Sequence, residues 1–227
     1  HTVNDPDLVD VFRLKINPNN ENQYYFDGEW IDLSIKKIKI KVKVLGIFSW
    51  KVKRVLYNSI HGPVLKTDHG TYAIRYASMG DVRLVEQWYR MNRSRNLSEF
   101  KQAMSIHAIP MFNTGYADKQ GNIYYVYNAK IPIRDPRYNW SDIVPSESKN
   151  SLWKGYIPYD DLPQILNPND GFFQNCNANP FLATGFPDDI KSKGNNKSAG
   201  IETHQTNRSL RAIRLYGGDE KISKSEF

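Results

Sequence analysis

The sequence predicts an α+β protein in which strands outnumber helices. Apolar and polar residues alternate along the first third, the apolar spacing becomes helical in the middle, and strand patterns return after that. With 227 residues, 40% of them hydrophobic, the chain is long enough to bury a core in one large or two small domains.

The first third is expected to form a meander of strands. The clearest pattern lies at 37–44, where a period of two predicts that the branched residues share one buried face and the lysines face water. The branched residues are Ile38, Ile40, Val42 and Val44, and the lysines are Lys37, Lys39, Lys41 and Lys43. Other strands are predicted at 9–16, 23–30, 48–57 and 70–76, the second broken by a tight turn at Asp27-Gly28.

Two helices are predicted in the middle of the chain. The first is indicated by apolar residues at helical spacing, which are Val82, Val85, Trp88 and Tyr89. The second should begin after Asn96, because an asparagine followed three residues later by Glu99 forms a capping box. Its buried face should consist of Leu97, Phe100 and Met104.

Strands and loops are expected after the helices. A hairpin should join strands at 109–112 and 123–127 through a polar turn. Residues 135–171, rich in Pro, Asn, Asp and Tyr, predict a long irregular connection, and residues 194–198 predict a mobile loop. A last helix should begin near Asn207 and end at Gly217-Gly218.

Composition excludes several classes of protein. The 31 basic and 24 acidic side chains give a formal charge of +7, a modest excess that indicates a solvated basic surface unless it is clustered. No apolar run approaches the roughly 18 residues needed to span a bilayer. The single cysteine, Cys176, excludes an internal disulfide and any multi-cysteine zinc site.

No common catalytic motif is present. The five histidines do not fall at a metal-binding spacing such as HExxH, and no GxSxG elbow or glycine-rich phosphate loop occurs. Cys176 among asparagines is more typical of a small buried residue than of a thiol nucleophile. Composition and spacing alone therefore indicate only a β-rich globular protein.

Three short motifs add a family resemblance. His61-Gly62-Pro63-Val64 resembles the HGPV segment of penicillin acylases, and Tyr116-Ala117-Asp118 with Gly121-Asn122-Ile123 resembles their YAD..GNI hairpin, which Pro132 and Arg134 continue. Asn175-Cys176-Asn177 with Pro180 resembles their NxNxxP motif. Because the motifs keep the family's order over nearly the whole chain, the sequence is identified as a member of the penicillin acylase (penicillin amidase) family of N-terminal-nucleophile hydrolases.

The resemblance implies a fold and an activity. Residues 1–227 would form an early-to-central part of the catalytic (beta) subunit, within a four-layer αββα sandwich of antiparallel sheets. The nucleophile would be a serine upstream of His1, freed by self-cleavage of a zymogen and activated by its own α-amino group. These residues alone, without that serine, the alpha subunit and the rest of the beta subunit, are expected to be inactive.

The implied substrates are acylated amines: penicillin and related antibiotics, acyl-homoserine lactones or lipopeptides. Family members are periplasmic or secreted. The resemblance implies no required cofactor, no nucleic acid partner and no membrane span.

The resemblance also assigns roles to residues of this chain. Asn177 would donate its side-chain amide to an oxyanion hole, the Val3 backbone N–H would be the second donor, and Arg208 would order Asn177. Asn175 would support them. Asp7, Asp10 and the Val9 carbonyl match positions that hold a structural calcium in some members.

Two other readings stay open. A catalytically inactive relative would keep the fold without the nucleophile, and the residues encoded upstream of His1 distinguish it from an enzyme. A basic sheet with exposed lysines and Trp50 is also typical of a module that binds single-stranded nucleic acid or acidic glycan, which a steep salt dependence would reveal.

Overall fold

The computed structural model describes residues 1–44, 46, 48–185, 190 and 199–217. The chain divides into two compact units. Unit 1 contains 1–8, 77–133 and the chain from 155 onward, and unit 2 contains 9–76 and 134–154. The loop predicted at 194–198 lies outside the described residues.

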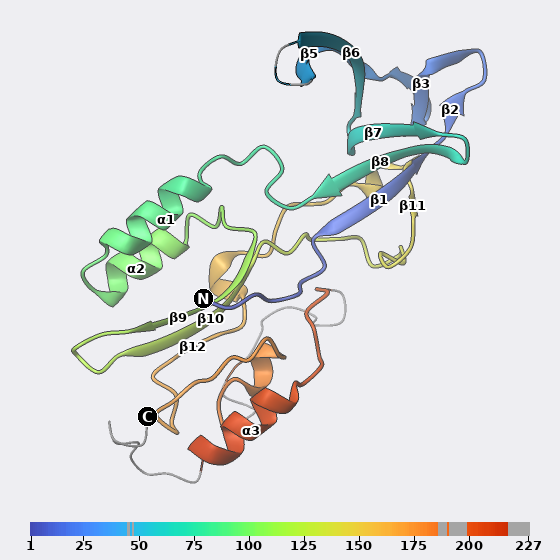
Figure 1. Cartoon of the computed structure of the whole chain (residues 1–227). Coiled ribbons are helices and arrows are strands. Elements are labelled where there is room, and N and C mark those ends of the chain that lie inside the picture. The colour runs from blue at the N-terminus through green and yellow to red at the C-terminus, as the bar shows by residue number, and fades with distance from the viewer. Residues whose placement is uncertain (45, 47, 186–189, 191–198, 218–227) are drawn as a thin grey trace. The chain divides into compact units, whose positions relative to one another are not determined.

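Unit 2 is built on two sheets (Figure 1). The larger has six strands in the order β11-β1-β8-β7-β6-β5, in which only the β1–β11 pair is parallel. Its strands are β1 (Val9–Leu14), β5 (Ser34–Val44), β6 (Phe48–Ser59), β7 (Gly62–Thr67), β8 (Gly70–Tyr76) and β11 (Val144–Pro145). The smaller sheet contains β2 (Ile16–Asn17), β3 (Asn20–Phe26) and β4 (Glu29–Asp32). The turn predicted at Asp27-Gly28 joins β3 to β4, with both residues at positive φ.

His61 lies in the core of unit 2. Its ring is fully buried 4.5 Å from the Phe12 ring, and its Nε2 lies 2.8 Å from the Ser151 hydroxyl. Burial, with a smaller contribution from the Arg75 charge, lowers the pKa of His61 to about 4. The ring is therefore neutral at pH 7, and the HGPV motif in which it lies is structural in this chain.

The β5–β6 hairpin departs from the sequence prediction. Its lysines are exposed as expected, but Ile40 and Val42 are 45% and 42% exposed, so the predicted burial of this apolar face is wrong. The reason is topology: β6 pairs with β7 only from Tyr57 to Ser59, and the rest of β5 and β6 extends as a two-stranded ribbon (Figure 1). Two strands alone have no second layer on which to bury a face.

Unit 1 combines helices with a three-stranded sheet. The sheet has the order β12-β10-β9, with β9 (Met111–Ala117) and β10 (Ile123–Ala129) forming the predicted hairpin and β12 (Gln164–Leu166) on its other edge. The helices are α1 (Leu84–Arg93), α2 (Leu97–Met104) and α3 (Asn207–Tyr216), with short 3₁₀ turns at Tyr159–Asp161 and Pro180–Leu182. None of these described helices is long and apolar enough to cross a membrane.

The predicted N-cap of α2 is confirmed, and the Glu99 carboxylate returns to the residue before the cap rather than to the Asn96 N–H. The Asn96 side chain accepts from the Glu99 N–H at 2.9 Å, and the Glu99 carboxylate accepts from the Arg95 N–H. Phe100 and Met104 are buried as predicted and join a core formed with strand β10, whereas Val85 of α1 is exposed. The long connection after residue 134 is mostly irregular and includes β11, a 3₁₀ turn at Lys149–Ser151 and β12.

Gly62 is held where no side chain fits, which gives a first prediction. A Cβ on Gly62 would lie 2.3 Å from the Ile74 carbonyl oxygen, and φ is +136°. Gly155 has a similar φ of +123° but open space around it. Gly155→Ala should therefore cost about 1–2 kcal/mol from backbone strain alone. Gly62→Ala should lower the free energy of unfolding by several kcal/mol more than Gly155→Ala does. Urea unfolding measures both values. Equal losses in the two variants would show that β7 and β8 are not packed this closely.

His61 predicts a pH dependence of stability. The folded chain resists protonation of His61 down to about pH 4, whereas the unfolded chain takes up the proton near pH 6.5. Stability should therefore fall as pH drops from about 6.5 to 4, by up to about 1.4 kcal/mol per pH unit from this group. Urea titrations at a series of pH values should show a shallower fall for His61→Gln. If the free energy of unfolding falls with pH equally in the wild type and in His61→Gln, His61 is not a buried neutral imidazole.

Candidate active site

Asn177 lies in a turn with an unusual backbone conformation. Its φ is +57°, a left-handed value that asparagine tolerates better than most residues. The Asn175 side-chain oxygen accepts from the Asn177 N–H at 3.0 Å, which closes a local Asx turn. The next residue, Ala178, is buried, which suits its small apolar side chain.

Arg208 holds the Asn177 amide in one orientation. Its guanidinium Nη2 donates to the Asn177 Oδ1 at 2.9 Å and to the Cys176 carbonyl at 3.2 Å. Because a guanidinium only donates, the atom facing it must be the amide oxygen, and the amide nitrogen points the other way. Thr206, which caps α3, also donates to the Cys176 carbonyl, so the start of α3 is fixed to this turn.

The Asn177 nitrogen points to Val3. Nδ2 donates one hydrogen to the Val3 carbonyl at 2.8 Å, which leaves its second hydrogen available. Within the described part of the chain, no acceptor is found for the Val3 N–H. Val3 follows a β-bridge between Thr2 and Asn113 of β9, so strand pairing sets its position. The structure thus brings together Asn177, Val3 and Arg208, the three catalytic residues that the sequence predicts.

Asn175 connects these parts. Its Oδ1 accepts from the Thr2 hydroxyl at 2.5 Å and from the Asn113 Nδ2 at 3.1 Å, in addition to the Asn177 N–H. The Tyr125 hydroxyl of β10 donates to Asn113 Oδ1 at 2.7 Å and accepts from Asn175 Nδ2 at 3.4 Å. Burial, together with the Glu202 charge, raises the pKa of Tyr125, so its phenol keeps the proton.

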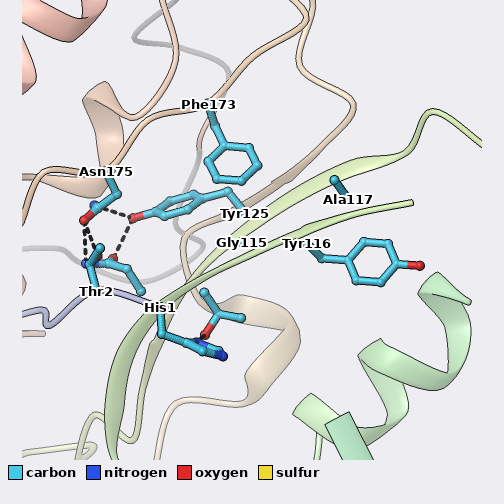
Figure 2. A pocket seen from close by; sticks show the side chains of 10 residues that line it. His1, Thr2, Gly115, Tyr116, Ala117, Tyr125, Phe173 and Asn175 are labelled. Atoms are coloured by element: carbon cyan, nitrogen blue, oxygen red, sulfur yellow. Dashed lines mark hydrogen bonds between the residues drawn. The ribbon is translucent and has the colours of Figure 1, made fainter. Parts of the chain in front are cut away.

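A cavity of about 320 Å³ opens beside Asn175 (Figure 2). Figure 2 shows the hydroxyls of Thr2 and Tyr125 converging on Asn175 at one end, with the Phe173 ring alongside. The cavity is lined mainly by apolar surface from β9, β10 and the segment 173–175. Gly115 makes room for Phe173, because a Cβ there would lie 2.6 Å from the ring. Thr2, Asn113, Tyr125 and Phe173 carry no motif, and their part in the site was not predicted.

Cys176 contributes its backbone rather than its thiol. Its carbonyl oxygen accepts from Thr206 and Arg208, and its side chain is half-buried rather than buried as the sequence suggests. No described interaction places a base beside the sulfur. The geometry therefore indicates a scaffold residue.

The predicted calcium residues are arranged for other contacts. Asp10 is buried, and its Oδ2 accepts from Arg134 Nε at 2.9 Å and from Trp153 Nε1 at 2.5 Å. The guanidinium at that distance already balances the carboxylate charge, so Asp10 Oδ2 is engaged by these two donors. Among the described residues, no group of three His, Cys, Asp or Glu side chains is arranged to hold a metal. Calcium at Asp7, Val9 and Asp10 stays a prediction.

Comparison with known proteins identifies the family. The sequence profile described as "Penicillin amidase" matches residues 1–227. The chain belongs to the penicillin amidase family. Members of this family hydrolyse linear amides, and the β-rich α+β architecture with several sheets is that of the N-terminal-nucleophile fold of penicillin G acylase.

Individual relatives are distant and longer than this chain. The acyl-homoserine lactone acylase PvdQ of Pseudomonas fluorescens (strain Pf0-1) is 28% identical in an alignment that covers 86% of this chain and 29% of that protein. Penicillin G acylase of Escherichia coli is 30% identical over 77% of this chain and 20% of its own length. The solved thermostable penicillin G acylase of Alcaligenes faecalis matches 99% of this chain with a TM-score of 0.75 and 26% identity. The match covers 38% of that chain.

Asn175 gives a prediction for this penicillin amidase site. Asn175→Ala would leave three donors without their acceptor, so we expect a loss of about 2–4 kcal/mol in unfolding free energy. Asn179, four residues on, is a matched control because its oxygen only caps the short 3₁₀ turn, and its alanine variant should lose about 1 kcal/mol. Chemical denaturation compares the two. If Asn175→Ala is no worse than the control, Asn175 does not hold the site together.

Proposed function

We propose that this chain supplies the oxyanion-binding part of an amidohydrolase that cleaves acylated amines. The observation that carries the proposal is a pair of donors for which the described residues offer no acceptor: the Val3 N–H and the second hydrogen of Asn177 Nδ2. Amide hydrolysis passes through a tetrahedral intermediate with a negative oxygen, and two fixed neutral donors stabilise that charge without transferring a proton. Family membership makes amide chemistry the first reaction to consider.

Arg208 acts through Asn177 in this proposal. Its positive charge lies on the Oδ1 side of the amide, so it polarises the group and strengthens the N–H on the opposite side. A donor fixed before the reaction needs no reorganisation as charge develops. Arg208 is therefore a positioning residue, and Asn177 and Val3 are the catalytic ones.

The remaining steps need groups beyond this chain. The proposed nucleophile is an N-terminal serine upstream of His1, and its α-amino group, with a pKa of about 8, takes the hydroxyl proton. Attack on the carbonyl forms the oxyanion, collapse releases the amine and leaves an acyl-enzyme, and water then releases the acid. In this proposal the chain is part of the beta subunit of a self-cleaving zymogen with a four-layer αββα sandwich. It would act in the periplasm or after secretion.

The cavity beside Asn175 is proposed to receive the acyl group. It is mainly apolar, with the Phe173 and Tyr125 rings on its wall, and about 320 Å³ accommodates an aromatic or medium-length acyl chain. Acyl groups of penicillins, homoserine lactones and lipopeptides are the candidates. The relatives' names include a penicillin G acylase and an acyl-homoserine lactone acylase, which supports this substrate class.

One alternative loses support from the structure. A module that binds single-stranded nucleic acid needs aromatic rings and cations on the same surface. The strand register places Trp50 opposite Val42, on the face away from Lys37, Lys39, Lys41 and Lys43, and the cations that share its face, Lys36 and Arg54, lie nearer the base of the ribbon. An inactive relative with the same fold is distinguished from an enzyme by the upstream sequence, where a cleavage junction before a serine supports the enzyme.

Asn177→Ala tests the proposal in the complete, processed protein. The side chain is proposed to bind the oxygen only after charge has developed, so kcat should fall by about a hundredfold to a thousandfold with KM nearly unchanged. Asn175→Ala should have a milder effect on kcat. Steady-state kinetics with a chromogenic acyl amide gives both constants, after intact self-cleavage has been verified by gel. A loss of less than about threefold would make Asn177 an ordinary turn residue.

A further inference from the structure

The β5–β6 ribbon carries a dense array of lysines that face one way. We call this the lysine face, which consists of Lys37, Lys39, Lys41, Lys43, Lys51 and Lys53. All six are exposed, and within the described residues none has a carboxylate partner. Lys39 lies directly opposite Lys53, and Lys41 opposite Lys51. Like charges directly opposite each other destabilise a strand pair, so the array costs stability in the isolated ribbon.

The opposite side of the ribbon is apolar in its outer part, and nearer the base it carries Arg54, opposite Ile38, and Lys36, opposite Leu56. Cross-strand register pairs Ile40 with Val52 and Val42 with Trp50 on this side, and Phe48 lies on it near the turn. Phe48 is 68% exposed and Trp50 69% exposed. Both residues thus lie at the far end of the ribbon, away from the stretch Tyr57–Ser59 in which β6 pairs with β7. The ribbon is therefore amphipathic across its thickness.

We propose that the β5–β6 ribbon is a docking element for an anionic lipid bilayer. A segment with aromatic and branched side chains on one face and lysines on the other lies in the plane of a membrane interface, with its apolar face among the upper acyl chains. Trp is favoured at the headgroup level. Each lysine near an anionic surface contributes about 1 kcal/mol of attraction. Attraction of the six lysines to the anionic surface offsets the repulsion between the lysine pairs that lie opposite each other.

Both faces of the ribbon are used in this arrangement. The lysines lie on the side away from the acyl chains, but their flexible stems bend toward the phosphates while the ammonium groups stay in water. The ribbon is a single layer, so its lysine ammoniums remain within about a Debye length, ~8–10 Å, of the headgroups. The attraction should therefore weaken as salt is added.

Other binding partners would contact only one face of the ribbon. A protein segment that covers the apolar face would make no use of the six lysines, which would stay solvated on the other side. A nucleic acid or acidic polysaccharide on the lysine face would leave Phe48 and Trp50 in water, because they lie on the other side. An anionic bilayer engages both faces. The proposal does not depend on the amidohydrolase function.

Vesicle binding tests the proposal with the complete protein. Sedimentation with phosphatidylglycerol–phosphatidylcholine vesicles should show binding at least about tenfold tighter than with phosphatidylcholine alone. Lys39→Glu/Lys53→Glu should weaken that binding at least about tenfold. The control Lys119→Glu/Arg211→Glu changes the net charge equally at exposed sites outside the ribbon and should change binding less than about twofold. Thermal melts confirm that all variants fold.

Tryptophan fluorescence tests the apolar face separately. Vesicle binding should shift the emission to shorter wavelength, and Trp50→Phe should keep the binding but lose most of the shift. Phe48→Ser/Trp50→Ser should lose binding, since the inserted surface is removed. Absence of vesicle binding would overturn the proposal. So would equal losses in the control variant, or binding to heparin or single-stranded DNA that is tighter than to anionic vesicles and leaves Trp50 emission unchanged.

Discussion

The charge-assisted hydrogen bond from Arg208 to Asn177 is the contact on which the candidate site depends. It joins the start of α3 to a turn held at positive φ, and it decides which end of the Asn177 amide points to Val3. Because the amide oxygen and nitrogen are nearly equivalent in shape, only the Val3 carbonyl would select the nitrogen if Arg208 were absent. The wrong orientation would present an acceptor to a developing negative charge, so the proposed function depends on this orientation.

Much of the local structure was readable from the sequence because short-range physics decides it. The Asn96 N-cap, the Asp27-Gly28 turn and the end of α3 at Gly217 each depend on residues within one turn of chain. The burial of Ile40 and Val42 was predicted wrongly because a period of two identifies a face but not what covers it. Which strands receive a second layer is decided by contacts far apart in the sequence.

The site was predicted by resemblance rather than from residue chemistry. Val3 lies 174 residues before Asn177, and Arg208 lies 31 residues after it. No local pattern therefore connects the three. The supporting residues Thr2, Asn113 and Tyr125 carry no motif, because hydrogen-bond networks form between residues that only the fold brings together. One signal was available for Tyr125 and Asn113: both are polar groups within the strand hairpin at 111–129, where a buried polar atom requires a partner.

If Arg208 acts through Asn177, the two side chains should be coupled in catalysis, and a double-mutant cycle on kcat in the complete, processed protein measures this coupling most directly. Asn177→Ala, Arg208→Met and the double variant are compared, with Arg211→Met as a control for an exposed arginine of the same helix. We expect the double variant to be no slower than Asn177→Ala alone. This corresponds to a coupling free energy between the two substitutions of about 2 kcal/mol or more. Losses that simply add, with a coupling below about 0.5 kcal/mol, would contradict it.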